Sequence, residues 1–303
     1  MLAQAFDQMQ TRFAIDLFRS IQVLADRHLG LREERLVLGG ATYSYATRGE
    51  GDRPLVLVHG FASDRSCWSL LLSKIKGSQR IIVLDLPAWG KSSFDSKASY
   101  TPLAQAQRLE EIRQALGIER WHLAGISMGG AISGVYAALY PDRVLSLSLL
   151  NAAGIGGSAQ APFVREALRG SNRLIMKVPE DIEALLSFVF LRRPFLPRFV
   201  KRALAFDYLR RRMIQERLFA DLIADPQILE RHFSMIKAPI QVIWGRYDKV
   251  IDVSCVETLR ALKSEIAVHI FEDCGHFPIM EKPRETAALL INFIRKQTHS
   301  RDT

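Results

Sequence analysis

The stretch Gly125-Ile126-Ser127-Met128-Gly129-Gly130 joins two segments of different pattern. An apolar, strand-like run, 121–124, precedes it, and small residues follow in a helical pattern, 131–140, as far as Pro141. A Gly-x-Ser-x-Gly between a strand and a helix is typical of a nucleophile elbow, a strained turn that lifts a serine hydroxyl above a sheet. A Cβ at either flanking glycine would collide with the neighbouring strand or helix. The stretch therefore predicts that Ser127 is a nucleophile at the positive end of a helix.

A catalytic serine needs a histidine that takes its proton. His276 lies in Cys274-Gly275-His276-Phe277-Pro278, directly after a strand-like run, 267–271, and from such a loop it can reach over the sheet. His59 ends another apolar run and is interpreted as a structural residue. The others lie in apolar strands or charged segments, at His28, His122, His232, His269 and His299. His276 is therefore the predicted general base.

The histidine in turn needs a carboxylate. In proteins with a nucleophile elbow, this carboxylate follows the serine and precedes the histidine along the chain. Asp248 follows an apolar run that ends in a turn at Gly245. Asp252 lies farther from the strand end and is predicted to cap a helix, 255–262, because aspartate is a good N-cap. Asp273 is too close in sequence to the histidine to orient its ring. Asp248 is therefore the predicted acid.

A tetrahedral intermediate needs hydrogen-bond donors for its oxyanion, usually backbone N–H groups. One is expected from Met128, directly after the nucleophile, and the other from Phe61, where Gly60 lets the chain turn after a strand. We expect the side chains of Phe61, Trp89 and Phe277 to line the substrate pocket.

Apolar runs alternate with helical patterns along most of the chain. Strands are expected near residues 34–38, 42–47, 54–58, 80–85, 120–124, 144–150, 239–244 and 266–271. This alternation predicts an α/β fold, with a mostly parallel eight-stranded sheet and helices on both faces. Between 156 and 235 the strand rhythm gives way to helical, arginine-rich sequence. We expect an N-terminal amphipathic helix (1–31), a core (32–155 and 236–303) and a helical insertion (156–235).

These pieces resemble the α/β-hydrolase superfamily in their order along residues 32–297. The matching segments are His59-Gly60-Phe61, 85–92, the serine turn, 244–248 and 275–283. Within the superfamily, the serine turn and Leu149 to Ile155 resemble bacterial lipases and monoacylglycerol-lipase-like serine esterases. Ala88-Trp89 departs from the commoner Gly-Phe pair. The resemblance implies a Ser-His-Asp triad, an acyl-enzyme intermediate and a cap, or lid, formed by the insertion.

Composition restricts the remaining possibilities. The chain has 303 residues and is 48% hydrophobic, which predicts one globular domain with room for an insertion. Its three cysteines have neither disulfide-like nor metal-site spacing, which favours a reducing compartment and predicts no metal site. We also expect no cofactor and a cytoplasmic location, either free or peripheral on a membrane. Cys274 is expected to be a buried thiol and not a nucleophile.

The first 30 residues form a predicted amphipathic helix, with apolar residues at three- and four-residue spacing. They are Phe6, Met9, Phe13, Leu17, Phe18, Ile21 and Leu24. Charged residues interrupt the apolar runs, which leaves none long enough to cross a bilayer, and the stretch lacks the features of a typical signal peptide. Two interpretations stay open, a helix packed on the protein's own surface and a helix resting on membrane lipid.

The predicted cap is strongly basic. Residues 192–217 hold nine lysines and arginines against two acids, so they carry seven of the chain's net nine positive charges. Two interpretations of this charge stay open: solvated helix faces, and attraction to anionic membrane lipid. Nucleic-acid binding is not expected, because no nucleic-acid reader motif is present. Interleaved aromatic and aliphatic residues give the cap an apolar side, as an acyl-chain substrate requires.

The leading hypothesis is a serine carboxylester hydrolase (lipase or esterase) that acts on lipid-like acyl esters, such as monoacylglycerols. One alternative is carbon–carbon bond hydrolysis of a diketone acid on the same triad. Another is a non-catalytic receptor or scaffold with this fold. Fold analogy does not decide the substrate, and the sequence leaves acyl-chain length, headgroup, lid state and oligomeric state open.

Overall fold

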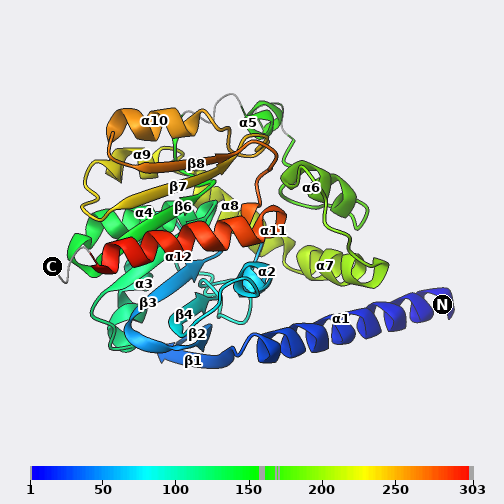
Figure 1. The fold of residues 1–303 in the computed structure, drawn as a ribbon. Coiled ribbons are helices and arrows are strands. Elements are labelled where there is room, and N and C mark those ends of the chain that lie inside the picture. Colours follow the sequence, from blue (N-terminus) through cyan, green and yellow to red (C-terminus); the bar gives the residue numbers. More distant parts are fainter. Residues whose placement is uncertain (1, 157–160, 168, 170, 300–303) are drawn as a thin grey trace.

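A central sheet of eight strands runs through the computed structural model, which describes residues 2–156, 161–167, 169 and 171–299 (Figure 1). The strands are β1 (Arg32–Leu38), β2 (Ala41–Arg48), β3 (Glu50–Val58), β4 (Gln79–Leu84), β5 (Trp121–Ile126), β6 (Val144–Leu150), β7 (Ile240–Gly245) and β8 (Ala267–Phe271). Their order is β1-β2-β4-β3-β5-β6-β7-β8. Strand β2 is antiparallel to both neighbours, and every other adjacent pair is parallel. The predicted fold class is confirmed.

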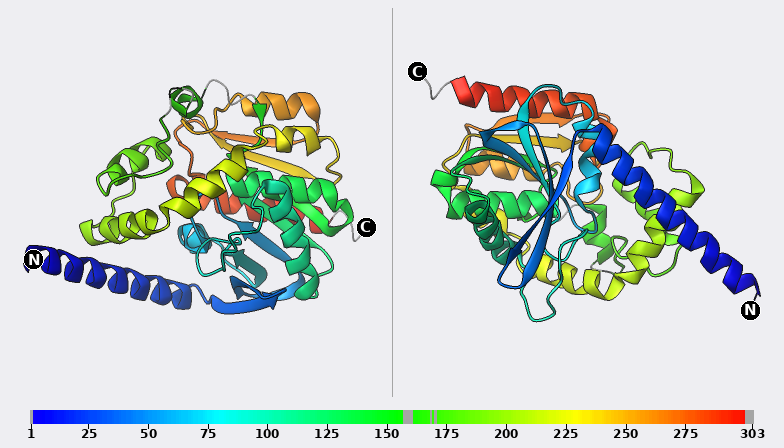
Figure 2. Two further views of the ribbon diagram at one scale, coloured as in Figure 1. Left: turned by 180° about the vertical axis from the view of Figure 1, so that it is seen from behind. Right: turned by 90° about the horizontal axis from the view of Figure 1, so that it is seen from below.

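Helices cover both faces of the sheet because its central strands are apolar on both sides. Along β3, Leu55 and Leu57 pack into one core with α2 and α12, whereas Val56 and Val58 pack into the other with α3, α4, α9 and α10. Figure 2 shows α12 on the opposite side of the sheet from α3 and α4. These elements are α2 (Ser69–Leu72), α3 (Pro102–Ala115), α4 (Met128–Leu139), α9 (Ile228–Phe233), α10 (Cys255–Leu262), α11 (Pro278–Glu281), α12 (Pro283–His299), η1 (Arg65–Trp68) and η2 (Pro141–Arg143).

The parallel register brings the carboxyl ends of four central strands to one edge. Val58 of β3 lies opposite Gly125 of β5, and Leu150 of β6 lies opposite Ile126 and, on its other side, Ile243 of β7. Loops that leave these ends therefore meet above the same edge, which is where ligands bind in open α/β sheets.

Four helices between β6 and β7 stand over that edge as a cap: α5 (Pro162–Ala167), α6 (Asp181–Val189), α7 (Arg198–Arg210) and α8 (Arg212–Ile223). The next helix, α9, returns to the core, where Leu229 is fully buried against α4 beside Gly134. The predicted insertion range, 156–235, thus includes one helix that packs on the core. The division into cap and core stays a prediction.

The predicted N-terminal helix forms as α1 (Leu2–His28), which extends from the sheet and lies beside α7 (Figures 1 and 2). Ala14 is buried on the packed side, whereas Phe13 and Leu24 are 69% and 62% exposed. The side chains of Phe6 and Met9 lie outside the described part. Among the helices that the structure describes, none is both long and apolar enough to cross a membrane.

Candidate active site

Ser127 occupies a strained turn between β5 and α4, with φ 55° and ψ −120°. Its N–H donates to the Leu150 carbonyl at 2.9 Å, which fixes the turn against β6. A Cβ on Gly125 would lie 2.2 Å from the Gly129 carbonyl oxygen, and one on Gly129 would lie 2.2 Å from that of Val58. The two glycines are therefore sterically required, and the turn presents Ser127 at the N-terminus of α4, as the sequence predicts.

His276 and Asp248 lie side by side, although they come from different loops. His276 Nδ1 is 2.7 Å from Asp248 Oδ2, and both side chains are buried. Because this nitrogen faces a carboxylate, it carries the proton and leaves Nε2 free to accept one. The Ser127 hydroxyl has no hydrogen-bond partner among the described residues. Catalytic hydrogen bonds often tighten only with substrate bound.

Four donors surround the Asp248 carboxylate. Oδ1 accepts the N–H groups of Val250 and Ile251 at 2.8 and 2.9 Å, and Oδ2 accepts His276 and the side-chain amide of Asn151 at 2.6 Å. Asn151 directly follows β6, with φ 44°, and is fully buried. Its only sequence signal is its place after a buried strand, which does not by itself indicate a site residue.

Replacing Asn151 by glycine tests this contact without straining the backbone, because glycine tolerates positive φ. We expect kcat to fall by about tenfold with KM nearly unchanged, since a hydrogen bond to a charged group contributes about 1.5 to 3 kcal/mol. Steady-state kinetics measures the split between kcat and KM, and thermal unfolding reports any global damage. An unchanged kcat in a folded variant would show that Asn151 is only packing.

The competing residues have other partners. The prediction that Asp252 caps α10 was wrong, because Ser254 is the N-cap. Asp252 Oδ1 instead accepts the Ser254 N–H at 2.9 Å, in the turn that precedes the helix. Asp273 pairs on the surface with Lys282 at 2.6 Å. Burial raises the pKa of the Cys274 thiol, which disfavours the thiolate that a nucleophile needs.

The His59 side chain hydrogen-bonds the backbone of the predicted oxyanion loop and of the loop after β4. Its ring is fully buried, donating from Nδ1 to the Gly60 carbonyl at 2.8 Å and accepting the Leu86 N–H at Nε2, 3.0 Å away. Burial lowers the pKa of His59, and the ring therefore stays neutral near pH 7. His59 joins the loops after β3 and β4, in agreement with its predicted structural role.

The predicted oxyanion donors lie on both sides of the serine. A Cβ on Gly60 would come within 3.2 Å of the Ser127 Cβ, which places the Phe61 loop directly against the nucleophile. Met128 is the first residue of α4. Within the described residues, neither the Phe61 nor the Met128 N–H donates a hydrogen bond to the protein. Both are thus available for a developing oxyanion, a role that stays a prediction.

An aromatic cluster connects the cap to these loops. Phe61 contacts Trp89 and Phe219 with ring centroids 5.3 and 5.4 Å apart, and Phe219 contacts Phe163 at 6.0 Å. Trp89 is only 2% exposed, so it lies behind Phe61 and supports that ring. The sequence did not single out Phe163 and Phe219, because nothing in their spacing reveals a partner on another element.

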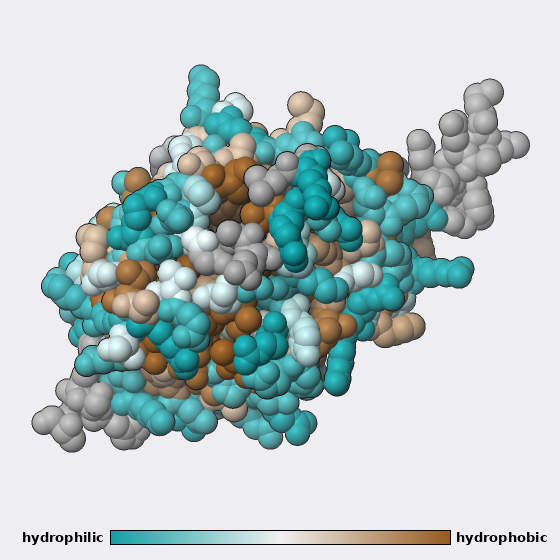
Figure 3. Space-filling model, turned by 90° about the horizontal axis from the view of Figure 1, so that it is seen from above, coloured by the Kyte–Doolittle hydropathy of each residue, from teal (hydrophilic) through white to brown (hydrophobic). Residues whose placement is uncertain are grey.

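A second aromatic contact lies beside the histidine. Phe277 packs against Phe190, the residue after α6, at 5.4 Å, and against the His276 ring at 5.8 Å. Two of the three predicted pocket residues, Phe61 and Phe277, thus bring apolar surface between the cap and the catalytic loops. Seen from above, brown apolar atoms lie in several patches between projecting teal polar side chains (Figure 3).

Arg211, between α7 and α8, joins the cap to the loop after β4. Its guanidinium lies over the Trp89 ring at 5.7 Å and donates to the carbonyl of Ala88. Ala88 has φ 73°, a left-handed conformation that glycine adopts more easily. Ala88, which departs from the commoner glycine of the resemblance, therefore has a conformation that favours glycine.

Comparisons with known proteins match this chain to the alpha/beta hydrolase fold and to lipases. The sequence model for the alpha/beta hydrolase fold matches residues 53–283. Monoacylglycerol lipase ABHD6 of Mus musculus is 31% identical over 83% of this chain and 79% of its own length. Lipase 1 of Psychrobacter immobilis is 33% identical over 80% of this chain and 77% of its own. The crystal structure of a membrane phospholipase A, a bacterial virulence factor, superposes with a TM-score of 0.90 at 34% identity, covering 97% of this chain and 96% of that one.

Proposed function

The chain belongs to the alpha/beta hydrolase family and is a carboxylester hydrolase, and from this premise we propose that it cleaves lipid-like acyl esters through Ser127, His276 and Asp248. The proposal is supported by the Asp248–His276 pair on loops that leave the same sheet edge as the serine elbow, and by a cap whose aromatic rings contact the catalytic loops. Such a lining suits an acyl chain.

In the first half of the reaction, Ser127 Oγ attacks the ester carbonyl carbon while His276 Nε2 takes the hydroxyl proton. The carbonyl oxygen becomes an oxyanion, which the Phe61 and Met128 N–H groups stabilise. Collapse of this intermediate breaks the bond to the leaving oxygen, which receives the proton from His276. The alcohol departs, and Ser127 carries the acyl group.

In the second half, water attacks the acyl-enzyme and gives its proton to His276 Nε2. The second tetrahedral intermediate releases the fatty acid and returns the proton to Ser127 Oγ. Asp248 holds the histidine tautomer throughout, through the 2.7 Å contact at Nδ1. Asn151 and the N–H groups of Val250 and Ile251 hold Asp248.

A second part of the proposal concerns the place where the enzyme binds its substrate. Helix α1 exposes Phe13 and Leu24, and the basic cap helix α7 lies beside it. Apolar side chains next to basic ones favour contact with anionic lipid, at about 1 kcal/mol per basic residue near the surface. We therefore propose a peripheral contact with anionic membranes, near which lipid esters are concentrated.

A series of p-nitrophenyl esters of increasing acyl length tests the substrate class. We expect kcat/KM to rise from acetyl to medium chains by at least tenfold, since each buried methylene contributes about 0.8 kcal/mol. Phe219→Ala should flatten that rise, because it removes a ring that packs on Phe61. No turnover of any ester, together with cleavage of a diketone acid, would instead support carbon–carbon hydrolysis on the same triad.

A further inference from the structure

One aromatic side chain of the cap is almost fully exposed. Phe195 is 91% exposed, and it lies in the segment 191–197 between α6 and α7. Neighbouring Leu191 is also exposed. Leaving a phenylalanine in water forgoes about 1.5 to 3 kcal/mol of burial. An exposed ring on a loop is therefore a candidate for insertion into an apolar medium.

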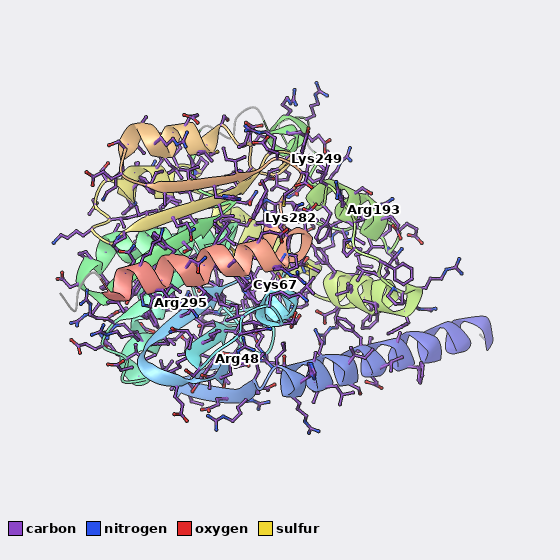
Figure 4. All side chains as sticks on the ribbon, in the orientation of Figure 1. Arg48, Cys67, Arg193, Lys249, Lys282 and Arg295 are labelled. Atoms are coloured by element: carbon purple, nitrogen blue, oxygen red, sulfur yellow. The ribbon has the colours of Figure 1, made fainter. Side chains whose placement is uncertain are left out.

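Basic residues flank Phe195 on both sides. Arg192 and Arg193 precede it, with side chains 74% and 53% exposed, and Arg198 begins α7 after it. Figure 4 shows Arg193 at this part of the cap. The first two arginines pair with carboxylates at 3.5 and 3.3 Å, whereas Arg198 forms no ion pair with the residues described. Exposed pairs contribute little, and lipid phosphates can therefore replace these carboxylates at small cost.

The same segment is attached to the loop of the catalytic histidine. The His276 N–H donates to the carbonyl of Val189, the last residue of α6, at 2.9 Å. Glu281 bridges the two loops: Oε1 accepts the Gly275 N–H at 2.9 Å, and Oε2 accepts the N–H groups of Leu191 and Arg192 at 3.0 and 2.9 Å. A ligand that seats Phe195 therefore acts on a segment that holds the histidine loop.

The acid loop has a similar attachment to the cap. Lys249, next to Asp248, donates from Nζ to the Ser187 carbonyl of α6 at 3.2 Å, and its own carbonyl accepts the Phe163 N–H at 3.0 Å. In Figure 4 Lys249 lies where the core meets the cap. Both the acid and the base are thus bound, through their own loops, to the helix that precedes Phe195.

We propose that the segment 191–197 is a lipid-docking loop, in which Phe195 inserts between the acyl chains of an anionic bilayer while Arg192, Arg193 and Arg198 bind its phosphates. This inference rests on the proposed function, because it identifies where the enzyme meets a membrane that holds its substrate. The docked bilayer then lies against a cap segment that is hydrogen-bonded to the loop of the catalytic histidine.

Tryptophan fluorescence tests the inference directly. All four tryptophans of the chain are buried, with exposures from 0% to 2%, so a tryptophan at position 195 reports its own surroundings. In Phe195→Trp we expect a blue shift with phosphatidylglycerol vesicles, quenching by brominated lipids, and reversal of both in high salt. The matched control is Met235→Trp, at an exposed position just before β7, on the edge of the sheet opposite Ser127.

Vesicle flotation, compared with the fluorescence, distinguishes docking through the segment 191–197 from docking through α1 or another surface. If the protein floats with phosphatidylglycerol vesicles while Phe195→Trp shows no shift or quenching, α1 or another surface carries the contact and the inference is wrong. Equal quenching of Met235→Trp would also overturn it, because burial would then not be specific to the loop. Failure to float with these vesicles at low salt would overturn both the loop and the proposed membrane contact.

Turnover separates docking from catalysis. We expect Phe195→Ser to lower hydrolysis of a long-chain ester in phosphatidylglycerol vesicles by about tenfold, while it retains most activity on a short soluble ester. An equal loss on both substrates would mean that Phe195 supports the catalytic loops and not lipid docking. If the wild-type protein hydrolyses neither ester, the proposed function itself is wrong, whatever the fluorescence shows.

Discussion

Ser127→Ala is expected to lower kcat by about a millionfold, because loss of a triad nucleophile has this effect in other serine hydrolases. The fold should persist, since the turn is set by backbone contacts and by Gly125 and Gly129, and alanine lacks only the hydroxyl. Steady-state hydrolysis of a medium-chain p-nitrophenyl ester measures the loss, and circular dichroism checks the fold.

Ser133→Ala is the matched control. Ser133 lies in the same helix, α4, and is fully buried, and its hydroxyl has no hydrogen-bond partner in the part of the chain that the structure describes. Removing it should change kcat by less than twofold, because such a hydroxyl contributes little. Undiminished turnover in Ser127→Ala, or a comparable loss in Ser133→Ala, would contradict the assignment of the nucleophile.

Asp248→Asn is expected to cost about ten-thousandfold in kcat, through loss of the productive histidine tautomer. The geometry gives the reason. The N–H groups of Val250 and Ile251 both point at Oδ1, so the carbonyl oxygen of an asparagine would take that position. Its NH₂ group would then face His276 Nδ1, and the imidazole would have to carry its proton on Nε2, where it cannot accept one from serine.

Asp252→Asn serves as the control for this substitution. Asp252 accepts one N–H in a turn before α10, and asparagine can form the same turn. Its kcat should therefore stay within about threefold of wild type, since surface substitutions away from special features have small effects. A large loss in Asp252→Asn with a small one in Asp248→Asn would show that the acid is misassigned.

Most of the fold could be predicted because its signals are local. The central strands contain buried apolar runs such as 55–58, 121–126 and 144–150, and the serine turn fixes a strand on one side and a helix on the other. The loops after β5, β7 and β8 then had to meet at one edge, since the strands are parallel. Ser127, Asp248 and His276 could be selected on that basis.

Contacts between distant segments were not predictable. Asn151 lies 97 residues from Asp248, and nothing around it in sequence indicates the hydrogen bond that joins them. Phe61 and Phe219 meet only because the cap folds back over the core. The prediction for Asp252 was wrong because two polar residues at nearby positions, Asp252 and Ser254, are both suited to begin the helix. Capping preference alone does not separate them.

The basic cap shows a second limit of sequence patterns. Counting residues 192–217 alone gives seven excess positive charges. In the structure, Glu183 pairs with both Arg193 and Lys201, and Asp221 lies 3.9 Å from Arg217. Acids outside the counted range therefore neutralise part of the charge, including that of Arg193 on the loop around Phe195.

The central claim is that Ser127 is the residue that becomes acylated. Wild-type protein treated with a long-chain fluorophosphonate can be analysed by intact-mass spectrometry and then by peptide mapping. We expect one adduct per chain, located on Ser127, and parallel loss of ester hydrolysis as labelling proceeds. An adduct on any other residue, or full ester hydrolysis after complete labelling of Ser127, would contradict it.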